Sequence, residues 1–229
     1  MKLSIVIPLF NEEENVIPMV DEIAQVFSDY DYELVLVDDG STDQTAARVP
    51  DHPGIRLVQF ESNAGQSAAM YAGIHAACGE IILLLDGDLQ NDPNGAPALI
   101  RSVESGESDL ACGYRTQRKD TRFKRLQSRV ANGVRSRFTG DGVRDTGCTL
   151  KAMRRECRDA LIPFAGMHRF IPALIKGAGF RIAEFPVNHR PRHTGTSKYG
   201  GGLGRALPAT RDMFGVKWFL SRRFSYKIK

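Results

Sequence analysis

The sequence predicts an α/β fold in which a mostly parallel sheet carries helices on both faces, followed by basic amphipathic helices at the C-terminus. Short apolar or β-branched runs alternate with segments of helical period through the first half, which is typical of parallel strands joined by crossover helices. The 229 residues are 42% hydrophobic and 25% charged, so disorder, collagen and coiled coil are excluded. Acidic clusters follow three predicted strands, at the sheet edge where ligands of such folds bind.

The first half is expected to alternate regularly between strand and helix. The predicted strands occupy residues 3–9, 32–37, 55–60, 80–85 and 109–113. The predicted helices occupy residues 13–27, 42–49, 66–78 and 94–103. Consecutive units of this kind form right-handed crossovers, so the strands should lie parallel.

The second half is less regular. A basic amphipathic helix is predicted over residues 123–138, where apolar residues recur at helical spacing among arginines. The chain then continues with a predicted strand over 145–150, a helix over 151–161, an apolar segment over 164–176, a strand over 181–187, a glycine-rich basic loop over 188–204 and a helical tail over 205–224. Because no repeat or linker interrupts this order, we expect one domain with a C-terminal elaboration.

Neither a disulfide framework nor a membrane span is expected. The four cysteines show no CxxC spacing, which favours reduced thiols in a cytosolic protein. The apolar run at residues 81–85 is far shorter than the roughly 20 residues of a spanning helix. The chain starts directly with a strand-like run, so we expect no signal peptide.

The charges divide sharply along the chain. Residues 1–110 contain 4 basic and 20 acidic residues, whereas residues 111–229 contain 27 basic and 7 acidic ones. Such asymmetry suggests that the second half meets an anionic partner: nucleic acid, phospholipid or a phosphorylated substrate. The alternative is that the two halves simply neutralise each other.

The strongest candidate for chemistry follows the predicted strand at 80–85. Asp86, Asp88 and Gln90 stand at i, i+2 and i+4 directly after five apolar residues. Oxygen ligands of this type suit Mg²⁺ or Mn²⁺, which bind through few protein carboxylates together with substrate phosphates. The alternative is a polar turn stabilised by Asp and Gly.

Two further acidic clusters end earlier strands. Asp38 and Asp39 precede Gly40, and a carboxylate at such a position commonly accepts hydrogen bonds from a nucleotide's ribose or base. Capping of the next helix by Thr42 is the structural alternative, but it does not require two acids before the glycine. Glu12 stands nearest the end of the first strand and is the third candidate ligand.

These motifs resemble family 2 glycosyltransferases of the GT-A fold. The resemblance rests on three strings at residues 4–15, 37–43 and 86–90. Later segments are similar to one branch, the dolichol-phosphate mannose synthases and bacterial polyprenyl-phosphate glycosyltransferases. Those segments lie at residues 113–115, 128–132, 145–151 and 191–198.

The resemblance implies an inverting transfer from a nucleotide-diphosphate sugar. It places the nucleotide against Pro8, Phe10 and Glu12, its base and ribose against Asp38 and Asp39, and Mg²⁺ or Mn²⁺ on Asp86, Asp88 and Gln90. It places the acceptor phosphate and the donor diphosphate near Arg115, Ser128 and Arg192, with Lys124, Ser197 and Lys198 close by.

A phosphate acceptor changes what catalysis requires. Its oxyanion is already a nucleophile at neutral pH, so positioning and stabilisation of the departing diphosphate suffice without a general base. Asp145 then orients an arginine, acts as a base if the acceptor is a hydroxyl, or merely caps a strand. Gly87 replaces the alanine that is frequent in the family, and Lys124 replaces an arginine, which removes bidentate phosphate binding there.

The resemblance therefore implies a hexosyltransferase that moves a sugar from GDP-mannose, or next from a UDP-sugar, to polyprenyl or dolichyl phosphate. Within a domain spanning residues 1–204, residues 1–113 would hold donor and metal and residues 114–204 the acceptor. The basic tail, residues 205–229, would contact the membrane surface or pack on the core. We expect a peripheral protein on the cytoplasmic face, with room for a membrane-embedded partner protein.

Two alternatives stay open at this point. The acceptor could be a glycolipid or polysaccharide hydroxyl. A nucleic-acid-binding protein using the basic half is the alternative outside enzymes, but it leaves three acidic clusters unexplained, so no nucleic-acid partner is expected.

Residues 200–204 lack GxGxxG spacing and are interpreted as a lid. Pro191 lies between His189 and His193, which argues against a helical zinc-binding pair. His168 could contact substrate, but a packed or solvated histidine is favoured.

Overall fold

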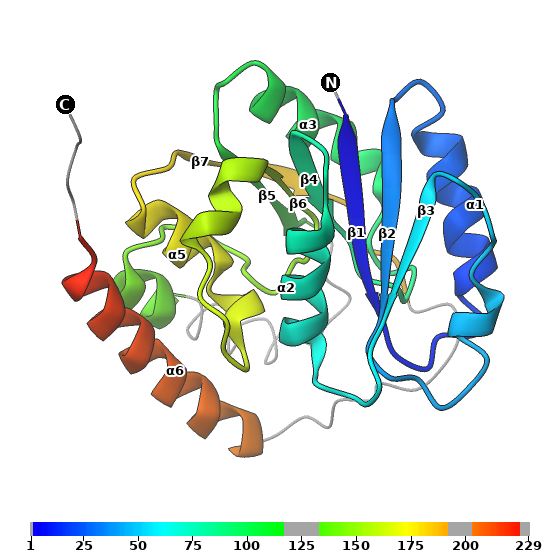
Figure 1. Ribbon diagram of the computed structural model, residues 1–229. Coiled ribbons are helices and arrows are strands. Elements are labelled where there is room, and N and C mark those ends of the chain that lie inside the picture. Colours follow the sequence, from blue (N-terminus) through cyan, green and yellow to red (C-terminus); the bar gives the residue numbers. More distant parts are fainter. Residues whose placement is uncertain (1, 117–132, 192–202, 225–229) are drawn as a thin grey trace.

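The computed structural model describes residues 2–116, 133–191 and 203–224, with the backbone alone for residues 203–207. Its strands form one seven-stranded sheet in the order β3-β2-β1-β4-β6-β5-β7 (Figure 1). The strands are β1 (Leu3–Leu9), β2 (Tyr32–Asp38), β3 (Ile55–Gln59), β4 (Ile81–Leu84), β5 (Leu110–Arg115), β6 (Lys151–Arg154) and β7 (Ile182–Val187).

Helices cover both faces of this sheet. The α-helices with labels are α1 (Val16–Val26), α2 (Gln66–Ala76), α3 (Ala96–Glu104), α5 (Ile171–Gly177) and α6 (Leu203–Arg222). Residues 133–139 are also helical, and 3₁₀ turns lie at η1 (Ala46–Arg48), η2 (Pro93–Gly95), η3 (Arg155–Ala160) and η4 (Met167–Arg169). The predicted fold class, a mostly parallel sheet between helices, is confirmed.

The parallel part of the sheet brings the acidic clusters to one edge. β1 pairs with β2 from Leu3 opposite Tyr32 to Leu9 opposite Asp38. β4 pairs with β1 on its other side, with Leu84 opposite Val6. Since these strands run in the same direction, the residues that follow them leave from the same edge of the sheet.

The second half corrects two predictions. Residues 151–154 form strand β6 instead of the start of a helix, and residues 145–150 form an irregular segment instead of a strand. β6 is inserted antiparallel between β4 and β5, where Ala152 is paired with Leu83 and Ala111 and is fully buried. Burial in the centre of a sheet therefore overrides the local helical pattern.

The predicted helix over residues 42–49 is only the short turn η1. Side-chain hydrogen bonds hold this segment against the end of β1 instead. The Thr45 hydroxyl accepts from the backbone N–H of Glu12 at 2.7 Å and donates to Asp43 at 2.5 Å. Such local bonds compete with helix formation.

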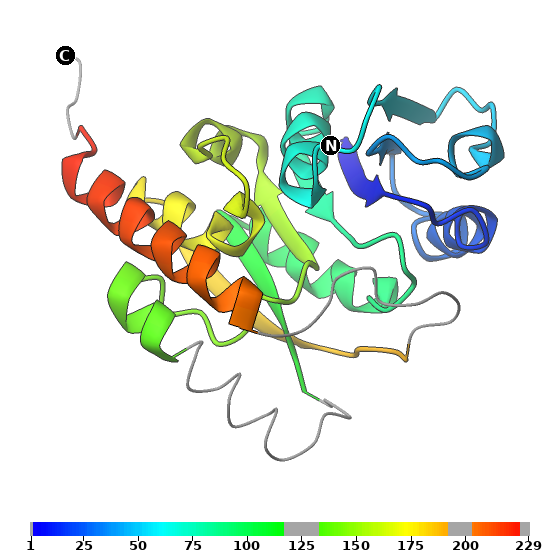
Figure 2. The same cartoon turned by 90° about the horizontal axis from the view of Figure 1, so that it is seen from below.

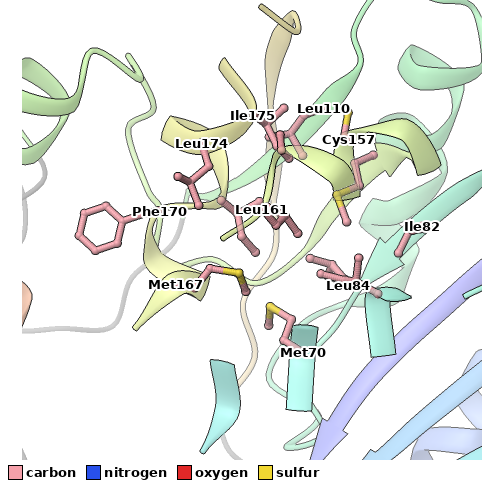
Figure 3. Packing of buried hydrophobic residues seen from close by; sticks show 14 of the residues in the cluster. Met70, Ile82, Leu84, Leu110, Cys157, Leu161, Met167, Phe170, Leu174 and Ile175 are labelled. Carbon is pink, nitrogen blue, oxygen red and sulfur yellow. The ribbon is translucent and has the colours of Figure 1, made fainter. Parts of the chain in front are cut away.

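Two hydrophobic clusters fill the space between sheet and helices. One lies under α1 and α3 and includes Ile5, Ile7 and Phe27. The other lies under α2 and α5, and Figure 3 shows Met70, Leu84, Met167 and Phe170 within it. Val6 belongs to this second cluster, so β1 alternates between the two faces as a sheet buried on both sides requires.

One glycine allows α2 to lie close to the sheet. A Cβ at Gly73 would come within 2.4 Å of Val6 and 2.9 Å of Val37. The helix backbone therefore rests directly on β1 and β2. This contact places the first turn of α2 beside the strand ends that carry the acidic residues.

The tail is the helix α6, which lies beside the helix at 133–139 at one side of the molecule (Figure 2). Val216 is buried in the core, and Met213 and Leu220 pack against it. The rings of Phe138 and Phe214 meet edge to face with centroids 5.0 Å apart. None of the helices within the described residues is both long enough and apolar enough to cross a bilayer.

Candidate active site

A cavity of about 960 Å³ opens at the carboxyl edge of the sheet. Residues from both oppositely charged halves of the chain line it. The predicted site residues among its lining are Pro8, Phe10, Glu12, Asp39, Asp86, Asp88, Gln90, Arg115 and Asp145. The structure thus brings the candidate metal ligands and the candidate phosphate-binding arginine into one cleft.

Asp39 forms one buried wall of the cavity. Its carboxylate accepts hydrogen bonds from the backbone N–H groups of Ala64 and Gly65 at 2.7 and 2.9 Å, and from the Asn63 amide at 2.9 Å. Burial raises the pKa of Asp39, the two backbone bonds oppose this, and the charge of Asp38 adds to it. These bonds fix the orientation of the carboxylate.

Asp38 occupies a different position from its neighbour. It is fully buried, and it is not among the residues that line the cavity. Its Oδ1 accepts the backbone N–H of Ser41 at 3.2 Å, and its Oδ2 has no hydrogen-bond partner among the described residues. Within this geometry Asp39, and not Asp38, is the carboxylate that a ligand in the cavity would meet.

The chain turns sharply after both β1 and β4. Asn11 and Leu89 have φ angles of +52° and +60°, and they are the only non-glycine residues of the described chain in the left-handed region. The Asn11 side chain accepts the backbone N–H of Thr42 at 2.8 Å, which holds the first turn. Strained backbone of this kind is concentrated at functional sites, and here it flanks Glu12 and Asp88.

Asp86, just after β4, is one of the carboxylates that line the cavity. It accepts hydrogen bonds from Gln66 at 3.1 Å and from Thr149. Burial, and then the charge of Asp88, raise its pKa, while Thr149, Lys151 and Arg115 oppose the rise, and the net result is a pKa of about 6. Without a bound cation, the groups around Asp86 therefore supply too little positive charge to offset the burial of its ionised carboxylate.

Asp88 and Gln90 complete the predicted metal-binding set. The Asp88 carboxylate accepts the backbone N–H of Gln90 at 3.1 Å, and the Gln90 amide donates to the carbonyl of Arg190 at 3.4 Å. Within the described residues no cluster of three or more His, Cys, Asp or Glu could hold a metal ion. The protein alone thus offers two carboxylates and an amide, which leaves coordination positions for substrate oxygens.

Arg115 and Asp145 form a two-pronged ion pair on the opposite wall. The distances are 2.7 Å from Nε to Oδ2 and 2.9 Å from a terminal nitrogen to Oδ1. Both side chains are largely buried. Burial works against the charge of Arg115, but its bonds to Asp145 raise its pKa, so the guanidinium stays charged. The carboxylate holds the arginine in one orientation, as the first of the three readings of Asp145 requires.

Several lining residues were not predicted from the sequence. Lys151 on β6 is buried and donates to the carbonyl of Cys148. Arg135, expected on a polar helix surface, is buried and bonded to Asp141 and Thr146. Gln66, Ser67, His168 and Arg169 also line the cavity. Lys151 stood within a segment that resembled the family and His168 was singled out in the sequence, whereas Gln66, Ser67 and Arg169 carried no sequence signal.

The other predicted site residues lie outside the described chain. These are Lys124, Ser128, Arg192, Ser197 and Lys198, as well as the loop at 200–204. The described chain that leads towards Arg192 is firmly held. Arg190 pairs with Glu22 at 2.6 Å and with Asp92 at 2.7 Å, and its backbone N–H binds the carbonyl of Gln90 at 2.9 Å.

Solved structures share this fold. Glucosyl-3-phosphoglycerate synthase from Mycobacterium tuberculosis, in complex with Mn²⁺, UDP and phosphoglyceric acid, matches with a TM-score of 0.70 at 23% identity, over 96% of this chain and 78% of that one. The same enzyme with Mg²⁺ and UDP matches with a TM-score of 0.70 at 22% identity, over 98% and 80%. These similarities show that the chain has the GT-A fold.

The chain belongs to glycosyl transferase family 2, whose model matches residues 4–161. It is 40% identical to dodecaprenyl-phosphate galacturonate synthase of Rhizobium johnstonii, over 96% of this chain and 68% of that protein. It is 35% identical to undecaprenyl-phosphate 4-deoxy-4-formamido-L-arabinose transferase of Proteus mirabilis, over 86% and 63%. The chain therefore spans about two thirds of the length of these relatives, and the resemblance to polyprenyl-phosphate glycosyltransferases is confirmed.

Proposed function

We propose that this chain transfers a sugar from a UDP-sugar to a polyprenyl phosphate, with inversion at the anomeric carbon. The observation that carries the proposal is that Asp86, Asp88 and the Arg115–Asp145 ion pair line the same cavity. The names of both relatives, which act on dodecaprenyl and undecaprenyl phosphate, support a polyprenyl acceptor. GDP-mannose, the first donor expected from the sequence, finds no support among them, so a UDP-sugar replaces it.

The donor nucleotide would lie along the ends of β1 and β2. Pro8, Phe10, Glu12 and Asp39 line this part of the cavity. A fixed carboxylate such as Asp39 is suited to accept hydrogen bonds from the base or the ribose. Asp38, buried behind it, supports the turn at Ser41.

A divalent cation, Mg²⁺ or Mn²⁺, fits the residues at the end of β4. Asp86, Asp88 and Gln90 would hold it, with the remaining positions filled by diphosphate oxygens and water. The raised pKa of Asp86 supports this assignment, because a cation there would supply the positive charge that the paired carboxylates lack. When bound, the ion would neutralise charge on the departing UDP.

The acceptor phosphate would enter on the side of Arg115. One of its oxygens attacks the anomeric carbon, the bond from that carbon to the donor diphosphate breaks, and UDP leaves. Because the attacking oxygen is already ionised, the chain needs to position it and not to remove a proton. Arg115, held by Asp145, would bind phosphate oxygens, and Lys124, Ser128, Arg192, Ser197 and Lys198 are proposed as further contacts.

The outer face of α6 is proposed to contact the membrane that holds the lipid acceptor. On α6, Phe214 is 58% exposed and Trp218 64%, and Arg211 and Arg222 are exposed as well; Phe224, just after the helix, is 88% exposed. Aromatic residues favour the membrane interface, and basic residues are attracted to anionic lipids. A peripheral enzyme on the cytoplasmic face, with a membrane-embedded partner protein, is the arrangement that we propose.

A donor panel tests the proposed function. The purified chain is incubated with undecaprenyl phosphate and UDP-galacturonate, UDP-galactose, UDP-glucose or GDP-mannose, with Mg²⁺, Mn²⁺ or chelator, and the lipid products are identified by mass spectrometry. We expect a lipid-linked sugar from at least one UDP-sugar, lost on chelation. Transfer only to hydroxyl acceptors, or nucleic-acid binding without transfer, would overturn the acceptor assignment. Full activity in the presence of chelator would refute the assignment of a divalent cation to the site.

A further inference from the structure

Four cationic side chains of the described chain line the cavity, and three of them are held by other residues. Arg115 is paired with Asp145, Arg135 with Asp141, and Lys151 donates to a backbone carbonyl. Arg169 differs from these three. Its side chain forms no ion pair within 4.0 Å and no hydrogen bond with the described residues, although it lines the same cavity. A guanidinium in that setting is available to an anionic ligand.

One acidic residue lies near Arg169 without pairing with it. Asp212 on α6 is partly buried, which raises its pKa, while the charges of Arg169 and Arg211 lower it. No ion pair joins Asp212 to Arg169 within the described chain. Arg169 therefore interacts with the Asp212 carboxylate only at longer range, and its guanidinium N–H groups stay available to a ligand in the cavity.

His168 stands next to Arg169 and contacts Ser67 on α2. The Ser67 hydroxyl accepts the backbone N–H of Gly166 at 2.9 Å and lies 2.7 Å from Nδ1 of His168. When the hydroxyl donates its own proton to Nδ1, the ring proton is on Nε2, and in that tautomer His168 is a second hydrogen-bond donor of the cavity lining.

This pair of donors lies close to the place where the donor sugar must sit. The residue before Ser67 is Gln66, whose amide binds Asp86 at 3.1 Å. The first turn of α2 thus joins the carboxylate that faces the donor diphosphate to the turn η4 that carries His168 and Arg169. A sugar attached to a diphosphate bound there would lie within the cavity that His168 and Arg169 line.

We propose that Arg169, assisted by His168, binds a carboxylate on the donor sugar, so that the donor class is a UDP-hexuronate. This inference rests on the proposed function and adds to it the class of sugar and the residues that select it. The guanidinium would bind the two oxygens of the carboxylate, and the Nε2–H of His168 would donate to one of them. The acceptor phosphate or the donor diphosphate could supply the same anionic oxygens, and the experiment separates these sources.

The test compares two donors that differ at one carbon. UDP-galacturonate carries a carboxylate at C6 where UDP-galactose carries a hydroxymethyl group. We expect Arg169→Gln to lower kcat/KM for UDP-galacturonate by roughly 10- to 100-fold while changing the value for UDP-galactose by less than about threefold. Affinity for UDP and KM for undecaprenyl phosphate should be unchanged. Arg169→Lys should recover part of the loss, because it keeps the charge and loses the fork.

Ser67→Ala tests the positioning of His168. Without the hydroxyl proton, Nδ1 can carry the ring proton itself, so nitrogen-15 shifts of the His168 ring should move towards the other tautomer. A smaller loss with UDP-galacturonate alone should accompany that change. An unchanged tautomer would show that Ser67 does not set the donor on His168.

The outcomes separate this inference from the proposed function. An equal loss for both donors in Arg169→Gln, with weaker UDP binding, would assign Arg169 to the diphosphate. An increase confined to the KM for undecaprenyl phosphate would assign it to the acceptor. Equal loss with a lowered unfolding temperature would reduce it to a structural partner of Asp212. Each result refutes carboxylate recognition while transfer to the lipid persists, whereas absence of transfer by the wild type refutes the proposed function.

Discussion

Replacement of Asp86 by asparagine should make the metal-free protein more stable and inactive. Burial raises the pKa of this carboxyl from 3.8 to about 6, so the folded state carries an unfavourable negative charge whenever the pH exceeds that value. The difference corresponds to a cost of about 3 kcal/mol at neutral pH. An amide occupies the same space without charge, so Asp86→Asn should recover up to that amount.

The sign of the pH dependence distinguishes this explanation from ordinary repacking. Below about pH 4 the carboxyl is protonated in both folded and unfolded states, so wild type and variant should have equal stability. The variant's advantage should grow between about pH 4 and pH 6 and remain constant above it. Urea unfolding in chelator, followed by circular dichroism at several pH values, measures the difference. A variant that is less stable at pH 8, or an advantage that is independent of pH, would refute the reasoning.

Asp109 provides a matched control with the opposite sign. Burial opposes its ionisation, but hydrogen bonds and the charge of Arg181, together with Arg154, lower its pKa. Asp109→Asn should therefore destabilise the protein at pH 8, and the loss should shrink as the pH falls. Adding Mg²⁺ with UDP should stabilise the wild type and the Asp109 variant, but not Asp86→Asn.

Three further outcomes are expected. Asp145→Asn should lower kcat with undecaprenyl phosphate by roughly 10- to 100-fold, because Arg115 loses a charged partner. The affinity for UDP, measured by calorimetry, should stay within about twofold. An equal loss of kcat and of UDP affinity would show that Arg115 and Asp145 act on the donor and not on the acceptor. In the metal-free protein, Lys151→Met should raise the pKa of Asp86 further, because a positive charge is removed; a carbon-13 titration of the Asp86 carboxyl in chelator measures this, and an unmoved midpoint would contradict it. Phe214→Ser combined with Trp218→Ser should weaken the flotation of the protein with anionic vesicles. Ile17→Ser, at an exposed position on α1, should leave flotation unchanged. Equal flotation of the two variants would show that α6 does not contact the membrane.

The acidic part of the site could be predicted from the sequence because it depends on short segments of the chain. Asp39, Asp86 and Glu12 each follow an apolar run, and parallel strands bring their carboxyl ends to one edge. The ion pair between Arg115 and Asp145 was within reach only through the family resemblance. Both residues stood in motifs, but their pairing across 30 positions left no trace in composition or periodicity.

The errors arose where tertiary contacts outweigh local preference. Residues 151–154 have a helical pattern, yet they form a strand because they pair with β4 on one side and with β5 on the other. This strand places Lys151 beside Asp86 and leaves 145–150 as an irregular wall of the cavity. Arg135 follows the periodicity of a surface helix, but Asp141 and Thr146 bind it in the interior.

By itself, the sequence determined the fold class, the alternation of strands and helices along the donor half and the acidic residues at the strand ends, because strand and helix periods and the polar residues that end them are properties of short segments. The tertiary structure alone decided that Asp39 and not Asp38 faces the cavity, that β6 runs antiparallel, and that Arg169 and His168 share a cleft with Asp86. Those facts depend on which distant segments pack together, since burial and the supply of partners for each polar atom are set by neighbours in space and not along the chain.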